Sequence, residues 1–169
     1  MRTLLNGKVA IVTGGGTGIG EAICREFSRE GAKLVVNGLP DDPVQDVVDA
    51  IAKEGAEAIA FAGDVSEEEN AQACIAAAVH TYGRLDILVN NAGVLLVNAE
   101  TDKMPVDKFD EQIRCNVRSA FLMTKYALTP AKGPVGAMAG QEAKTPPRGT
   151  LDLQHTHEGT RHKDVVKIG

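Results

Sequence analysis

The chain has 169 residues, a length that fits one domain with a sizeable core, and 43% of them are hydrophobic. Its formal net charge is -5, with no dense Lys/Arg cluster, which argues against nucleic acid as a partner. No apolar run approaches the roughly 20 residues that span a membrane, and the start is too short and polar for a signal peptide. The three cysteines are odd in number and widely spaced, as in reduced thiols, so we expect a cytoplasmic protein.

Strand and helix patterns alternate along the first 128 residues. The strand segments are short β-branched runs, and the helix segments carry apolar residues at spacings of three and four. In chain order the sequence predicts strand 8–13, helix 18–30, strand 33–37, helix 44–54, strand 56–62, helix 67–82, strand 85–89 and helix 107–128. This alternation predicts an α/β fold with a doubly wound, Rossmann-type parallel sheet of about four strands in the order 3-2-1-4.

Three details of the helices can be predicted as well. Gly31 is expected to end the first helix. Ser66, followed by Glu69, has the pattern of a capping box, which predicts Ser66 as the N-cap of the third helix. We expect an inward-facing apolar set in the last helix, made of Phe109, Ile113, Val117, Ala120 and Phe121.

The chain changes character at Thr129. Prolines and glycines become frequent, and no period of 2 or 3.6 persists, so residues 1–128 are predicted as the nucleotide-binding domain and 129–169 as an irregular tail. His155, His157 and His162 lie in this tail without a cysteine partner or a framework that would hold ligand geometry. We therefore predict no metal site.

A glycine-rich segment, Thr13-Gly14-Gly15-Gly16-Thr17-Gly18-Ile19-Gly20, joins the first predicted strand to the first predicted helix. Glycines let the backbone approach a pyrophosphate, and a helix N-terminus supplies N–H groups and a positive dipole end. The spacing T-G-x-x-x-G-x-G resembles the short-chain dehydrogenase/reductase family. The alternative is a glycine turn that serves only close strand–helix packing.

The segment Asn90-Asn91-Ala92-Gly93 follows the fourth predicted strand and matches the N-N-A-G motif of the same family. Small residues at a strand's carboxyl end leave room for a ligand, and Asn side chains can tie neighbouring strand ends together. A plain Asn/Gly turn is the alternative reading of this segment alone. The two motifs together carry the resemblance, which extends from Asn6 to about Leu128.

The resemblance implies an NAD or NADP cofactor and a set of site residues. The implied cofactor-binding residues are Gly14, Thr17, Gly18, Ile19, Gly20, Asp64, Val65, Asn91, Ala92 and Gly93. In similar proteins the Asp–Val pair contacts the adenine ring, whereas Asp64 alone reads as a turn or cap residue. Asn116 matches the family's catalytic Asn, which supports a water in a proton relay; without the resemblance it reads as a solvent-facing residue.

The end of the second predicted strand bears on the choice between NAD and NADP. Gly38 stands where the resemblance expects the Asp that binds the ribose 2′-OH, and Asp41 and Asp42 follow shortly after. No Arg or Lys occurs in 14–18 or 37–43 to hold a 2′-phosphate. The absence of positive charge favours NAD.

The family's Tyr-x-x-x-Lys motif and its preceding Ser are missing from the chain. The tyrosines are Tyr82 and Tyr126. The motif needs a Lys four positions after the Tyr, but Asp86 and Pro130 occupy those positions. The serines, Ser28, Ser66 and Ser119, all lie upstream of the position expected for the family's Ser. Segment 129–138 resembles the C-terminal extension of some family members, so we expect an internal deletion that removes the catalytic half.

Two functional hypotheses follow. The first is an NAD(P)(H)-binding oxidoreductase by descent, whose full-length relatives act on an alcohol or carbonyl substrate, and which is inactive alone. The second is a non-catalytic nucleotide-binding or interaction fragment that pairs with a full-length relative. An unpaired edge on the fourth strand and the apolar stripe of the long helix predict association, including a homo-oligomer.

Overall fold

The computed structural model describes residues 3–96, 99–128 and, as backbone, 164–167. Its elements are β1 (Val9–Val12), α1 (Gly18–Arg29), β2 (Lys33–Gly38), α2 (Val44–Lys53), β3 (Ala58–Ala62), α3 (Glu68–Tyr82), β4 (Ile87–Asn90), a 3-10 turn (Thr101–Lys103), α4 (Val106–Ile113), a π-helical turn (Arg114–Arg118), α5 (Ser119–Leu128) and β5 (Asp164–Lys167). Within these ranges, no helix is long and apolar enough to cross a membrane.

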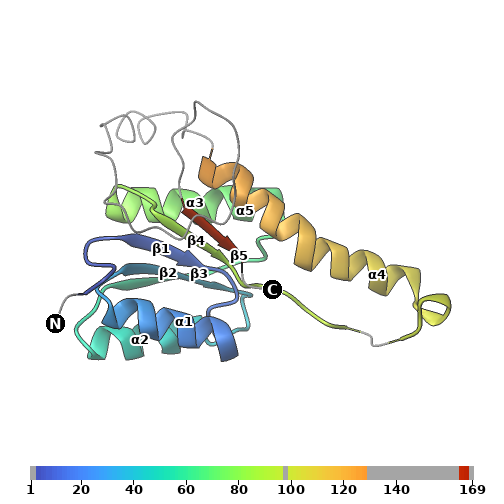
Figure 1. Ribbon diagram of the computed structural model, residues 1–169, viewed down its shortest axis with the longest axis horizontal. Coiled ribbons are helices and arrows are strands. Elements are labelled where there is room, and N and C mark those ends of the chain that lie inside the picture. Colours follow the sequence, from blue (N-terminus) through green and yellow to red (C-terminus); the bar gives the residue numbers. More distant parts are fainter. Residues whose placement is uncertain (1–2, 97–98, 129–163, 168–169) are drawn as a thin grey trace.

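The strands form one parallel sheet in the order β3-β2-β1-β4-β5 (Figure 1). The predicted order 3-2-1-4 is confirmed. Ile11 in the middle of β1 lies opposite Val35 of β2 and Leu88 of β4, so three branched aliphatic residues meet on one layer. The order reverses at β1, and its carboxyl end with that of β4 forms the crevice where ligands bind in such sheets.

A fifth strand lies within the segment predicted as irregular. Asp164–Lys167 pairs in parallel with Ile87–Asn90, so the prediction of an unpaired edge on β4 is wrong. The edge offers a row of backbone N–H and C=O groups, and the β-branched Val165 and Val166 favour extended backbone. A four-residue strand after a long polar stretch is too short to show a period. Residues 129–163, with His155, His157 and His162, lie outside the described part of the chain.

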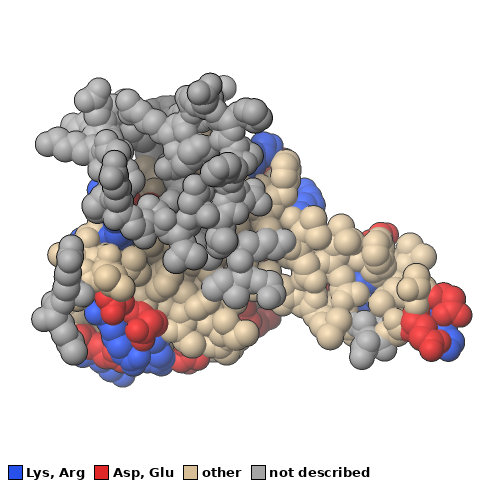
Figure 2. Space-filling view, viewed as in Figure 1, with Lys and Arg blue, Asp and Glu red and all other residues tan. Residues whose placement is uncertain are grey.

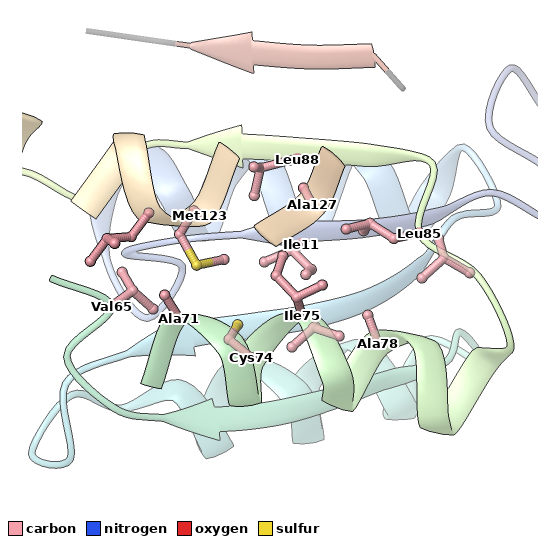
Figure 3. Close-up of a cluster of buried hydrophobic side chains, with 13 residues drawn as sticks. Ile11, Val65, Ala71, Cys74, Ile75, Ala78, Leu85, Leu88, Met123 and Ala127 are labelled. Carbon is pink, nitrogen blue, oxygen red and sulfur yellow. The ribbon is translucent and has the colours of Figure 1, made fainter. Parts of the chain in front are cut away.

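Helices cover both faces of the sheet. In Figure 1, α1 and α2 lie against one face, and α3 and α5 against the other. Because side chains alternate along a strand, Val12 points to the α1–α2 side and Ile11 to the α3–α5 side. Each side holds a cluster of buried hydrophobic side chains. Figure 3 shows the cluster on the α3–α5 side, where Leu88 from β4 and Met123 from α5 pack with Ile75 from α3. The two clusters fix the carboxyl ends of β1 and β4, where the predicted site lies.

The long helix predicted at 107–128 contains a π-helical turn and faces the sheet with other residues than expected. The buried residues of α5 are Ser119, Leu122, Met123 and Ala127, whereas Phe109, Ile113, Val117 and Phe121 are exposed. The prediction that these four face inward is wrong. The helix carries two apolar faces, and α5 alone reaches the sheet while α4 projects from the body (Figure 1).

The predicted N-cap of α3 is also displaced. The helix begins at Glu68 with Glu67 as N-cap, and no side chain caps it. Ser66 instead donates its backbone N–H to Asp64 at 2.9 Å, while its hydroxyl receives a hydrogen bond from Arg114. The predicted capping box is therefore wrong, because the hydrogen bonds with Asp64 and Arg114 hold Ser66 outside the helix. The predicted stop at Gly31, with φ +88°, is confirmed.

Candidate functional site

Hydrogen bonds tie the carboxyl ends of β1 and β4 together. The Thr13 hydroxyl accepts the backbone N–H groups of Asn91 and Ala92, both at 3.0 Å, and donates to the Val89 carbonyl at 3.3 Å. The Asn91 side-chain amide donates to the carbonyls of Thr13 at 3.0 Å and Gly14 at 3.1 Å. The expectation that an Asn of the motif ties strand ends holds for Asn91. Thr13 was not foreseen as a site residue.

The glycines of the β1–α1 turn have two different functions. A Cβ on Gly20 would overlap the Gly14 carbonyl oxygen and lie 2.6 Å from the Asn91 side-chain nitrogen, so close packing requires glycine there. Gly14 has φ +62°, and a Cβ would approach the Ala92 Cα to 3.0 Å. Gly18 has φ +56°, yet no atom lies within 4 Å of its added Cβ. Packing explains Gly20, whereas at Gly18 the space beside the backbone stays open.

The N-terminus of α1 faces this open space. Thr17 has extended backbone and makes no side-chain cap with the helix. The first intrahelical acceptor is the Thr17 carbonyl, which receives the Glu21 N–H at 3.2 Å. The N–H groups of the first turn thus keep their capacity to bind an anion. Ile19 is 67% exposed and places an apolar side chain beside them.

Asn116 lies in the π-helical turn and holds the backbone that follows the N-N-A-G segment. Its side-chain oxygen accepts the Val94 N–H at 2.7 Å, and its amide donates to the Val94 carbonyl at 2.8 Å. A Cβ on Gly93 would lie 3.1 Å from the same oxygen. This pairing gives a reason for an Asn in mid-helix, and it shows a positioning contact. At the end of β4, the Asn90 side-chain amide donates to the Thr124 hydroxyl at 3.2 Å and ties β4 to α5.

Asp64 and Val65 follow β3 and differ in environment. Val65 is buried in the α3–α5 core. Asp64 accepts the Ser66 N–H at 2.9 Å and an Arg114 guanidinium N–H at 2.6 Å. Burial alone would raise the pKa of the Asp64 carboxyl, but the hydrogen bonds from Ser66 and Arg114 outweigh it and lower the pKa. Arg114, which also reaches Glu67 at 3.3 Å, is a second residue that the sequence did not single out.

Neither tyrosine is positioned as a proton donor at the crevice. Tyr82 closes α3 at the opposite end of the sheet and donates to the Leu34 carbonyl at 3.3 Å. Tyr126 donates to the Glu68 carboxylate, and the Lys125 ammonium lies 4.8 Å from the Tyr126 ring centroid. The Ser28 hydroxyl donates to a carbonyl of α1, and the Ser119 hydroxyl donates to the Cys115 carbonyl in the π-helical turn. The Ser66 hydroxyl accepts from Arg114.

Comparison with known proteins identifies the family. The model of the short chain dehydrogenase family matches residues 8–139, which include the glycine turn, the N-N-A-G segment and Asn116. The chain belongs to this family. The match also runs past Leu128 into the segment predicted as tail.

Relatives and solved structures match at similar levels. An uncharacterised oxidoreductase of Bacillus subtilis is 39% identical over 124 residues, which cover 73% of this chain and 45% of that protein. An L-rhamnose 1-dehydrogenase (NAD(P)(+)) of a Sphingomonas species is 39% identical over 125 residues, which cover 73% of this chain and 49% of that protein. A short chain dehydrogenase from Mycobacterium avium superposes with a TM-score of 0.71 at 36% identity, covering 76% and 48%. A short chain dehydrogenase from Burkholderia cenocepacia, in complex with NADP, superposes with a TM-score of 0.69 at 33% identity. The superposition covers 75% of this chain and 51% of that chain.

The chain spans about half the length of the relatives it matches. Among the described residues, no group of three or more His, Cys, Asp or Glu side chains is placed to hold a metal ion.

Proposed function

We propose that this chain binds NAD(H) or NADP(H) through the β1–α1 turn and is the cofactor-binding half of an oxidoreductase. The observation that carries the proposal is Gly18: its positive φ and the empty space beside it have no packing explanation, and they lie at the uncapped start of α1. A pyrophosphate fits there, because the turn offers backbone N–H groups and no side chain blocks them. Membership of the family and the NADP complex of a family member support it.

The remaining cofactor contacts that we propose are those implied by the family resemblance. Gly14, Thr17, Gly18, Ile19 and Gly20 form the pyrophosphate side, with Asp64 and Val65 toward the adenine. Asn91, Ala92 and Gly93 line the crevice at the end of β4. The nicotinamide side leans on residues that this chain lacks, so we expect an affinity reduced by two decades or more, in the micromolar range or weaker.

Titration of the protein with NADH, followed by fluorescence or calorimetry, tests the binding. We expect Gly18→Val to abolish it, since a β-branched side chain would fill the space at the helix start. Gly55→Val is the matched control, because Gly55 also has positive φ (+84°) and open space but lies in the α2–β3 turn. Equal loss in both variants would mean that backbone strain, not the site, is responsible; unchanged binding in Gly18→Val would leave the glycine turn purely structural.

We further propose that the chain alone does not catalyse dehydrogenation. The bound cofactor supplies or takes a hydride, but reduction of a carbonyl also needs a proton at the alkoxide oxygen. General acid catalysis is worth about 10²–10⁴-fold, and substrate positioning more. Asn116 supports a water by family analogy but donates no proton at neutral pH. We expect no NADH turnover with a panel of ketones and alcohols. Robust turnover would refute this, and Tyr126→Phe would then be the first variant to measure.

The alternative function, an interaction module, has one specific observation in its favour. Phe109, Ile113, Val117 and Phe121 form an exposed apolar stripe, with Phe121 62% exposed. They repeat every four residues, which on an α-helix drifts by about 40° per step. The wider π-helical turn reduces that drift, so the four side chains stay close to one side of the helix. In Figure 2, charged residues gather at the tip of the projecting arm.

We propose that a second copy of the chain covers this stripe. Size-exclusion chromatography with light scattering should show a dimer or larger assembly that Phe121→Gln shifts toward monomer. Leu4→Gln, which changes a more exposed apolar residue outside the stripe, is the control. A parent chain that runs as a monomer at high concentration would contradict self-association.

A further inference from the structure

Apolar packing does not place the π-helical turn Arg114–Arg118 or helix α4. None of their residues is buried, and α4 projects from the body in Figure 1. The helix α5, which follows directly, instead buries Ser119, Leu122, Met123 and Ala127. Since burial of a helix face is what ordinarily fixes a helix to its domain, the position of this turn depends on its polar contacts.

Two arginines attach the turn to the corner between β3 and α3. The Arg114 guanidinium donates to the Asp64 carboxylate at 2.6 Å and to the Ser66 hydroxyl, and it lies 3.3 Å from the Glu67 carboxylate. Arg118 donates to the Ser66 carbonyl and lies 3.7 Å from the Glu67 carboxylate. Arg114 makes the shorter ion pairs, and charge-assisted bonds of this kind are about twice as strong as neutral ones.

The corner that receives Arg114 is itself fixed to the sheet. Val65 is packed in the α3–α5 core, and Ser66 is fully buried. The Asp64 carboxylate accepts the Ser66 N–H at 2.9 Å. The Asp64 carbonyl accepts the Glu67 N–H at 3.0 Å and the Asn70 side-chain amide at 3.2 Å. The carboxylate therefore has a defined place, and Arg114 transmits that place to the turn.

On its other side, the turn holds the chain that follows the N-N-A-G segment. Asn116, two residues after Arg114, accepts the Val94 N–H at 2.7 Å and donates to the Val94 carbonyl at 2.8 Å. The Ala92 N–H is held differently, by the Thr13 hydroxyl at the end of β1. The position of Val94 thus depends on the turn, whereas that of Ala92 depends on the sheet.

We propose that Arg114 is a positioning residue, which keeps Asn116 on Val94 by fixing the turn to Asp64. Without its guanidinium the turn is left with the contacts of Arg118, and Asn116 releases Val94 more often. The consequence for a ligand rests on the proposed cofactor binding, because Asp64 and Gly93 are proposed contacts at the two ends of that site.

Amide hydrogen exchange of the ligand-free chain, followed residue by residue by NMR, tests the proposal. A bonded amide exchanges when its bond opens, so the rate at Val94 measures how often Asn116 releases it. Arg114→Gln should raise this rate about tenfold, as expected for the loss of hydrogen bonds from a charged group, and should leave the rate at Ala92 unchanged. Arg114→Lys, which keeps the charge and a donor, should restore most of the protection.

Two further variants set the scale. Asn116→Ala removes the acceptor itself and gives the upper limit of the Val94 rate. Lys125→Gln is the matched control: it removes an ion pair between α5 and α3, to Glu68 at 3.0 Å, and should leave Val94 unchanged. A parent-like Val94 rate in Arg114→Gln, or equal acceleration at Val94 and Ala92, would overturn the proposal.

Titration with NADH measures the consequence for the proposed site. Arg114→Gln should bind NADH at least about threefold more weakly than Lys125→Gln, because the two ends of the site are no longer held in one arrangement. Equal affinities would show that the crevice does not depend on the turn and would overturn that consequence. A parent chain that binds no NADH would refute the proposed function, while the exchange rates, measured without ligand, still decide the role of Arg114.

Discussion

Replacing Thr13 by Val should destabilise the fold because one buried hydroxyl serves both strand ends. Thr13 is 2% exposed, and Val has nearly the same shape, so packing is preserved. The loss leaves the N–H groups of Asn91 and Ala92 without their acceptor, while the Val89 carbonyl still receives the residue 13 N–H at 3.0 Å. An unsatisfied buried donor costs about 1–3 kcal/mol, and these two bonds are only partly buried, so we expect the free energy of unfolding to fall by about 2–4 kcal/mol.

Urea denaturation followed by far-UV circular dichroism measures this effect. With a slope near 2 kcal/mol per M, the midpoint should fall by about 1–2 M. Thr13→Ser is the control, since it retains the hydroxyl and loses one methyl group, which costs about 1 kcal/mol. If the Val and Ser variants have the same midpoint, the hydroxyl contributes nothing and the role assigned to Thr13 is wrong.

Three other measurements test separate parts of the structure. Gly20→Ala should lower the free energy of unfolding by about 3 kcal/mol or more because its Cβ has no space, whereas Gly18→Ala should cost about 1 kcal/mol, for backbone strain only; equal costs would contradict the division between them. The pKa of Asp64 is lowered below its ordinary 3.8, so its contribution is present above that pH and is lost as the pH falls further; stability measured between pH 5 and 2 should decline less steeply in Asp64→Asn. Burial raises the pKa of the Cys24 and Cys74 thiols to about 12, so iodoacetamide at pH 8 should modify them only after unfolding, as mass spectrometry can show.

Local periodicity was enough to predict most of the sheet. β1 to β4 and α1 to α3 were predicted to within one or two residues, because the strands are short apolar runs, the helices have helical apolar spacing, and turns rich in glycine or polar residues separate them. The helix at 107–128 was misjudged for the opposite reason, since it has two apolar faces and periodicity does not tell which one the sheet covers. Only tertiary contact decides between Phe121 and Leu122.

The site was predictable as a set of motifs but not as a set of contacts. The glycine turn and the N-N-A-G segment were visible in the sequence, and the family match confirms the resemblance. The bonds that join them link residues 78 positions apart, as in Asn91 to Thr13, and no local pattern reports them. The same holds for Arg114, which reaches across to Asp64.

The pairing of β5 with β4 is made between main-chain groups, from Ile87 opposite Asp164 to Asn90 opposite Lys167. Main-chain pairing asks little of the side chains that arrive, beyond extended backbone and a tolerated shape. The edge of β4 therefore accepts a neighbouring strand on main-chain grounds and places few demands on its sequence. Different strands can fill such an edge, which makes β1 to β4 a suitable starting unit for chimaera design.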